Sequence, residues 1–265
     1  MEQATTLRDF LKVLFRQKAV VLTSFITVAV TVAVGLKFQT PVFEGTVKMM
    51  VSAEKQVESP YYQPMLGTRN MEVALAQSEI VTSNPVIERA VRAVGLFERP
   101  LDYEKNFASR LKRPFIIWGA QTWEKKLAQA PEEQRKGLKF RIVVEDLKRH
   151  VKVEPVRDTN LFTITVRDYS QVGSAILANV VSRSYIIFDL QQQLAETQLK
   201  YGEKHPSSIQ LQDSIDAMIK NLNGQPLPDV EAIGPASVKI VEQASLPLQP
   251  AGIPKVLTFI LGIFM

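Results

Sequence analysis

One uncharged apolar segment near the N-terminus constrains this chain more than any other feature. Between Lys18 and Lys37 the sequence reads AVVLTSFITVAVTVAVGL, 18 residues without Asp, Glu, Lys or Arg. At about 1.5 Å per residue, a helix of this length covers roughly 27 Å of a hydrocarbon core about 30 Å thick. Its hydroxyl side chains are compatible with lipid, because a helical hydroxyl can bond to the carbonyl one turn earlier. The segment predicts a transmembrane helix at 19–38.

Two other interpretations compete with a retained transmembrane helix. A helix on a globular core would show one polar face, whereas this segment is apolar on all sides. A cleaved signal peptide would end in a small-x-small pattern, and KFQTPVFEG at 37–45 contains none. A retained helix in a cytoplasmic membrane is therefore favoured. Basic residues outnumber acidic ones ahead of it, which predicts a cytoplasmic N-terminus at 1–18: Arg8, Lys12, Arg16 and Lys18 against Glu2 and Asp9.

Composition limits the remaining classes. The 265 residues are 46% hydrophobic and 22% charged, enough for a folded core of one or two domains. The net charge of +5 comes from scattered Lys and Arg, and no aromatic and basic module appears, so nucleic-acid binding is not expected. The absence of cysteine excludes disulfides and thiolate metal sites.

Alternating apolar and polar residues predict an antiparallel β component. The segment VFEGTVKMMVS at 42–52 places one set of apolar side chains on a single face, as in a half-buried strand. The segments HVKVEPV at 150–156 and LFTITVR at 161–167 flank RDTN, which has turn chemistry, so they predict a hairpin. A last strand is expected in SVKIVE at 237–242.

Helical signals are of uneven strength. Residues 84–95 combine Asn84 as N-cap, Pro85 at the first helical position and Gly95 at the end, which predicts a helix. Residues 70–83 are also compatible with a helix. From 101 to 149 the pattern is weaker, with short helical pieces at 122–130 and 143–150 separated by Pro131 and Gly137.

A long helix is predicted at 171–201, with a break at His205-Pro206 and a shorter helix at 207–222. Apolar residues recur along the long helix near heptad spacing, a pattern typical of helix pairing. We therefore predict oligomerisation through Ile176, Val180, Ile187, Leu190, Leu194 and Tyr201.

The C-terminal segment combines prolines with a short apolar run. Pro247, Pro250 and Pro254 exclude a helix over 245–254, and VLTFILGIFM follows. Ten residues cover roughly 15 Å as a helix, about half of the hydrocarbon core. We expect 255–265 to be the start of a second transmembrane helix that continues for roughly ten more apolar residues in the natural gene product.

Catalytic constellations are missing. The two histidines, His150 and His205, have no metal-binding spacing, and neither a nucleophile elbow nor a phosphate-binding loop is present. Glu145 and Asp146 are adjacent, so on a helix they point about 100° apart. Such pairs are usually solvated rather than catalytic. No enzyme activity, cofactor or metal is expected. A basic group, Lys105, Arg110, Lys112 and Arg113, could meet phosphate or acidic sugar, although a solvated charged face is favoured.

The order of these features resembles the Wzz-type chain-length determinants, the polysaccharide co-polymerases of the bacterial inner membrane. The matching stretches lie at 7–21, 40–52, 76–96, 147–168, 172–185 and 238–255. YGEKHPSSIQLQDSI at 201–215 is similar to the branch related to exopolysaccharide export and tyrosine autokinases. Each motif is weak alone, and 97–140 matches least. The long helix is short for the family, and the fused kinase domain of some relatives is missing.

The resemblance implies an α+β membrane protein with two transmembrane helices and cytoplasmic termini. A periplasmic α/β base at 39–170 would carry a helical protrusion at 171–222, followed by a return segment at 223–244. The implied function is non-catalytic control of polysaccharide chain length, or assistance to export, as a homo-oligomeric ring. The implied partners are a polymerase or export machinery, the lipid bilayer and the growing polysaccharide. The rival interpretation is a membrane-anchored periplasmic sensor or adaptor subunit.

Overall fold

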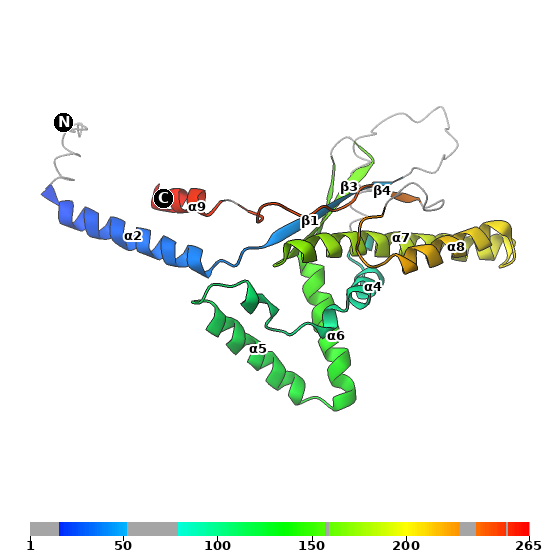
Figure 1. The fold of residues 1–265 in the computed structure, drawn as a ribbon, viewed down its shortest axis with the longest axis horizontal. Coiled ribbons are helices and arrows are strands. Elements are labelled where there is room, and N and C mark those ends of the chain that lie inside the picture. The colour runs from blue at the N-terminus through cyan, green and yellow to red at the C-terminus, as the bar shows by residue number, and fades with distance from the viewer. Residues whose placement is uncertain (1–15, 52–78, 157–158, 228–236, 253, 265) are drawn as a thin grey trace, which may run out of the picture.

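The computed structural model of this chain describes residues 16–51, 79–156, 159–227, 237–252 and 254–264 (Figure 1). They form a mixed α+β fold. The helices are α2 (Lys18–Phe38), α4 (Asn84–Val94), α5 (Arg113–Ala128), α6 (Glu132–His150), α7 (Gln171–Tyr201), α8 (Pro206–Lys220) and α9 (Lys255–Phe264). The strands are β1 (Phe43–Val51), β2 (Val151–Pro155), β3 (Leu161–Asp168) and β4 (Val238–Glu242), and two short 3₁₀ helices are η1 (Leu96–Glu98) and η2 (Tyr103–Asn106).

The four strands form one antiparallel sheet in the order β2-β3-β1-β4. The hairpin predicted from its alternating pattern is confirmed as β2 and β3, and the predicted first and last strands are β1 and β4. Val47 and Met49 of β1 are buried while Thr46 and Lys48 are exposed, as the alternation indicates. A register shift at Lys48 and Met49 lets β1 pair with β4 on its other edge.

Helix α7 covers one face of this sheet. It begins at Ser170, whose hydroxyl accepts a hydrogen bond from the Gly173 amide and caps the first turn. Gly45 of β1 allows the close approach, because a Cβ there would lie 2.2 Å from the Ser174 carbonyl oxygen. The core therefore contains the first half of α7. The predicted division between base and protrusion at 170–171 stays a prediction, and the first half of α7 packs on the sheet.

The second half of α7 and the antiparallel helix α8 form an arm that extends away from the sheet (Figure 1). The predicted break is confirmed, because α7 ends at Tyr201 and α8 starts at Pro206. Ser208 donates to the Gly202 carbonyl across the turn at the tip of the arm. Leu211, Ile215 and Met218 of α8 are buried against α7.

Helix α4 packs on α7 and α6 packs on α4, and both helices correct a sequence-based expectation. The N-cap of α4 is Ser83 and not Asn84, while Gly95 ends the helix in the left-handed conformation as predicted. Helix α6 runs without a break through Gly137, although a break was expected there. A helical glycine costs about 1 kcal/mol relative to alanine, which the burial of Val144 and Leu147 in the core offsets. Most of the helix expected at 70–83 lies outside the described residues.

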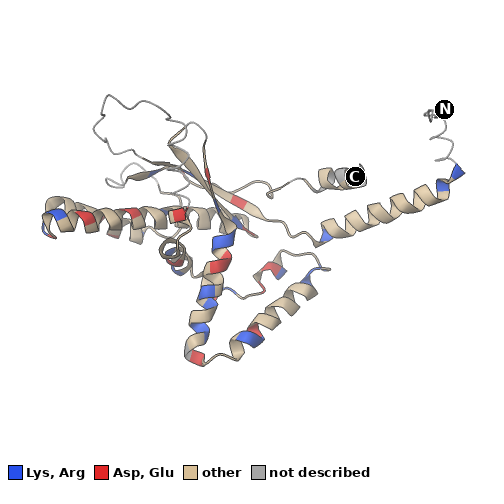
Figure 2. Cartoon of the chain, turned by 180° about the vertical axis from the view of Figure 1, so that it is seen from behind, with Lys and Arg blue, Asp and Glu red and all other residues tan. Residues whose placement is uncertain are grey.

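Helix α2 is the one described helix that is long and apolar enough to cross a membrane. None of its residues is buried, and Lys and Arg occur only at its ends (Figure 2). The ten-residue α9 runs back along it, and a Cβ on Gly262 would lie 3.0 Å from the Val32 side chain. The Ala251 amide donates to the Val42 carbonyl (2.7 Å), so the chain returns to α2 beside the point where it left.

Candidate functional site

Most of the residues predicted to form an oligomer contact lie in the chain's own core. Val180, Ile187 and Leu190 are fully buried against the sheet and the neighbouring helices. Ile176 and Leu194 are half-buried and pack against the same core, and Tyr201 is exposed at the tip of the arm, stacked on His205. The buried residues therefore satisfy the near-heptad pattern within one chain, and oligomerisation of the chain stays a prediction.

A buried guanidinium, that of Arg183, joins α7 to the loop after α8 and to the residue that follows β4. Arg183 has no exposed surface, and it donates to three neutral oxygens: the Asn221 carbonyl (2.7 Å), the Gln225 carbonyl and the Gln243 side chain (3.1 Å). Burial lowers the pKa of the Arg183 guanidinium. The group nonetheless stays charged, because arginine does not deprotonate in proteins.

Asn179, one turn before Arg183, completes what we call the α7 clamp. Its amide donates to the carbonyls of Gly224 and Ala244 at 3.2 Å, and its oxygen accepts from the Ala244 amide at 2.9 Å. Together the two side chains hold the loop after α8 and the end of β4 against α7. The clamp is a candidate structural centre that sequence reasoning missed, although two polar residues four apart in an apolar helix were its signal.

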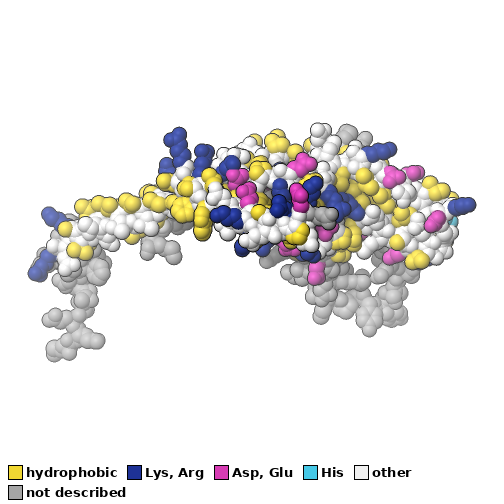
Figure 3. All heavy atoms as spheres, turned by 90° about the horizontal axis from the view of Figure 1, so that it is seen from below, with side chains coloured by type: hydrophobic (Ala, Val, Ile, Leu, Met, Phe, Trp, Pro, Cys, Tyr) yellow, Lys and Arg dark blue, Asp and Glu magenta, His cyan; other side chains and the backbone are white. Residues whose placement is uncertain are grey.

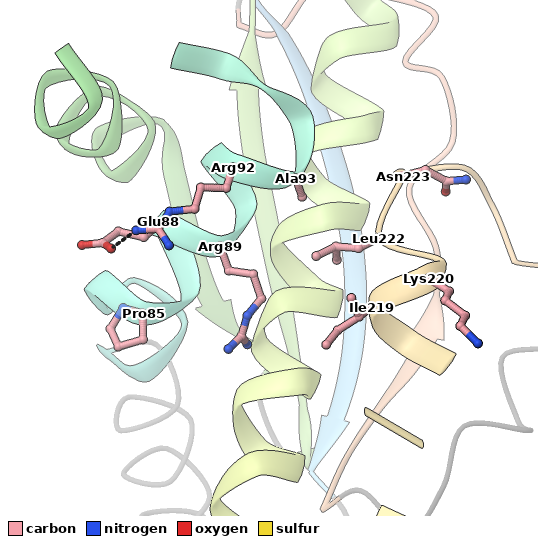
Figure 4. A pocket seen from close by; sticks show the side chains of 9 residues that line it. All are labelled: Pro85, Glu88, Arg89, Arg92, Ala93, Ile219, Lys220, Leu222 and Asn223. Atoms are coloured by element: carbon pink, nitrogen blue, oxygen red, sulfur yellow. Dashed lines mark hydrogen bonds and ion pairs between the residues drawn. The ribbon is translucent and has the colours of Figure 1, made fainter. Parts of the chain in front are cut away.

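A groove of about 670 Å³ opens between α4 and the end of α8 (Figure 4). Its lining residues are Pro85, Glu88, Arg89, Arg92, Ala93, Ile219, Lys220, Leu222 and Asn223. The α4 wall is basic and the α8 wall is partly apolar, since Ile219 and Leu222 point toward α4 whereas Lys220 points away from it.

The charges on the α4 wall of the groove are already engaged within the chain. Arg89 donates to the Ser184 carbonyl (3.0 Å) and to Gln191 (2.6 Å), and burial lowers its pKa. Arg92 contacts Glu88 and lies over the Phe140 ring. Glu88 is the one carboxylate of the lining, and it is paired with Arg92. The chemistry of the groove suits binding of an anionic or partly apolar group.

The proline-rich segment lies where the chain approaches α9. Residues 245–250, including Pro247 and Pro250, form neither helix nor strand, as predicted, and Leu248 is exposed. Pro254 immediately precedes α9, and its carbonyl accepts from the Thr258 amide in the first turn. The prolines therefore separate β4 from α9.

No model of a known protein family matches this chain, and no curated protein matches it. Across the described ranges, no group of three or more His, Asp or Glu side chains could hold a metal ion. The main guide to function is therefore the arrangement of three parts: the apolar helix α2, the body formed by the sheet and the helices that pack on it, and the arm.

Proposed function

We propose that this chain is a non-catalytic scaffold of the bacterial inner membrane that regulates the chain length of a cell-surface polysaccharide. O-antigen, capsule and exopolysaccharide are the candidate polymers. The proposal combines the resemblance to polysaccharide co-polymerases with one structural observation. The chain enters and leaves its folded body at a single place, beside one apolar helix, and its helical arm extends from the opposite end (Figure 1).

The paired path of the chain supports a body held on one side of the membrane. Strand β1 follows α2 directly, and β4 lies next to β1 in the sheet before the chain returns to α9. Helix α9 contacts α2 and points back toward the N-terminal end of α2 (Figure 1). With the basic residues ahead of α2 retained in the cytoplasm, this path would put the body in the periplasm and both ends in the cytoplasm.

The arm supports a scaffolding role. Helices α7 and α8 pack on each other and leave apolar side chains free at the distal end, where Leu199 is 88% exposed and Tyr201 is 64% exposed. A rigid two-helix arm that ends in exposed apolar groups suits contact with another copy of the chain or with a polymerase. This replaces the buried residues of α7 as the predicted contact.

Deletion of the gene tests the proposal. The deletion strain should still make the polysaccharide, but its length distribution on a gel should broaden, and expression of the wild-type chain should restore it. Complete loss of polymer would indicate a role in initiation or export, and an unchanged distribution would contradict length regulation.

The groove between α4 and α8 favours a second candidate, a membrane-anchored sensor or adaptor. A sensor needs a ligand site, and the groove is large enough for a small ligand. The same deletion strain separates the two functions. A changed transcript profile with an unchanged polymer length would favour the sensor.

A further inference from the structure

Helix α5 begins with apolar side chains that the described part of the chain leaves mostly exposed. Leu111, in the turn that leads into the helix, is 53% exposed, Phe115 is 63% exposed and Trp118 is 72% exposed. Phe115 and Trp118 are three residues apart and therefore share a face. None of the residues of α5 is buried. An aromatic surface of this kind in water indicates a binding partner.

Two contacts hold this surface at the end of α2. The rings of Phe38, the last residue of α2, and Phe115 meet edge-on with their centroids 5.9 Å apart. Thr40 donates to Glu104 (2.7 Å), and Lys112 donates to both Thr40 (2.9 Å) and Glu104. Burial raises the pKa of Glu104, but the hydrogen bonds from Lys112 and Thr40 outweigh this and lower it, so the cluster is ionised. The start of α5 is thereby fixed where α2 ends (Figure 1).

This position sets the depth of the surface once α2 lies in a bilayer. The polar layer on each side of the hydrocarbon core is about 5–7 Å thick. Phe38 is the last residue of α2, and the Phe115 ring lies 5.9 Å from the Phe38 ring, so Phe115 would lie close to the boundary between the hydrocarbon core and this layer. Hydrophobic side chains run along α2 and continue onto the adjoining body, with Lys and Arg beside them (Figure 3).

The chemistry of the surface matches the same layer. Tryptophan and other aromatic rings concentrate at membrane interfaces, where one side is apolar and the other is hydrated. Arg110 and Arg113 flank the apolar residues, and basic side chains of this kind are attracted to anionic headgroups. A contact with a second copy would instead favour a patch depleted in charge. We propose that Leu111, Phe115 and Trp118 form an interfacial membrane anchor, which inserts into the bilayer leaflet from which α2 emerges.

The two tryptophans of the chain provide a direct test, because both lie on α5. Trp123 is five residues beyond Trp118 and so points about 140° away from it, and Lys126 lies over its ring. Trp123→Phe leaves Trp118 as the sole tryptophan, and Trp118→Phe leaves Trp123. The full chain is reconstituted in phosphatidylcholine and phosphatidylglycerol vesicles, with and without lipids brominated near the top of the acyl chain.

We expect brominated lipid to quench Trp118 about twofold and Trp123 only marginally, because bromine quenches at short range and Trp118 alone would lie in the interface. A third variant, Phe25→Trp in a chain with both native tryptophans replaced by Phe, reports whether α2 itself is in the bilayer. If that variant is quenched while Trp118 is quenched no more than Trp123, the proposal is wrong. A blue-shifted but unquenched Trp118 would likewise overturn it, in favour of a protein contact.

The proposal requires α2 to lie in the bilayer, but it does not depend on any role in polysaccharide synthesis. The Phe25→Trp control measures whether α2 lies in the bilayer, and the polymer-length gel measures the role in polysaccharide synthesis. Failure of the interfacial anchor is therefore distinguishable from failure of the proposed function.

Discussion

Replacing Arg183 by methionine tests whether the α7 clamp holds the return segment of the chain. Methionine keeps an unbranched apolar stem but removes every donor of the guanidinium. The carbonyls of Asn221 and Gln225 and the side-chain oxygen of Gln243 would each lose a charged donor. The two backbone carbonyls in the loop after α8 would then remain without this hydrogen-bond donor near the core, or the loop would move away from α7.

The magnitude follows from these three hydrogen bonds. Each bond to a charged group contributes about 1.5–3 kcal/mol, while the desolvation of a buried guanidinium costs several kcal/mol and offsets part of this sum. We expect a net destabilisation of about 3 kcal/mol, which for a domain of this size lowers the melting temperature by roughly 6–12 °C.

Thermal unfolding of the detergent-solubilised chain, followed by circular dichroism, measures this change. The matched control is Arg89→Met, which removes a partly exposed guanidinium that also bonds to a backbone carbonyl of α7. We expect the control to lower the melting temperature by no more than about 3 °C, because Gln191 is open to water and the buried Ser184 carbonyl still accepts the helical hydrogen bond from the amide four residues later. If Arg183→Met shifts the melting temperature no more than Arg89→Met, the clamp does not stabilise the fold.

Two further substitutions test other parts of the fold. Leu190→Asp should unfold the chain, because it puts a carboxylate at a fully buried position at a cost of several kcal/mol. Leu199→Asp changes a position that is 88% exposed. It should leave the melting temperature unchanged and weaken any cross-linked oligomer. A folded Leu190→Asp chain with a lost oligomer ladder would restore the original assignment of α7. Asp168→Asn tests a buried carboxyl whose pKa is raised by burial, with Arg99 acting in the opposite direction. Because that pKa is raised, the protonated Asp168 carboxyl contributes to the stability of the fold below its unfolded pKa of about 3.9. This contribution is lost as the pH rises through the pKa of the folded state. The melting temperature of the variant, relative to wild type, should therefore be higher at about pH 7 than at about pH 4, and the opposite order would contradict the direction of the shift.

The elements predicted correctly were those whose signals are local. The hairpin of β2 and β3 follows from alternation around a turn, and α4 ends at Gly95 because a residue without Cβ adopts the left-handed conformation easily. The break before Pro206 follows from the steric effect of proline on its predecessor. The continuity of α6 through Gly137 could not be read locally, because packing against α4 decides it.

The candidate site was harder to predict because its partners are remote in the sequence. The apolar spacing along α7 correctly indicates that this face is covered, but it does not say by what, and the sheet of the same chain covers it. The acceptors for Arg183 come from 38 to 60 residues further along the chain. The interfacial surface of α5 likewise depends on Phe115 meeting Phe38, which no spacing within α5 could indicate.

Both proposals rest on α2 crossing the bilayer and holding the body on the far side from the N-terminus. Because the chain has no cysteine, single cysteines at Thr5 and at the exposed Glu203, in the turn between α7 and α8, give an unambiguous readout. In intact spheroplasts, a membrane-impermeant thiol reagent should label Glu203→Cys at once and Thr5→Cys only after the membrane is permeabilised. Labelling of Thr5→Cys but not Glu203→Cys in intact spheroplasts would contradict the account.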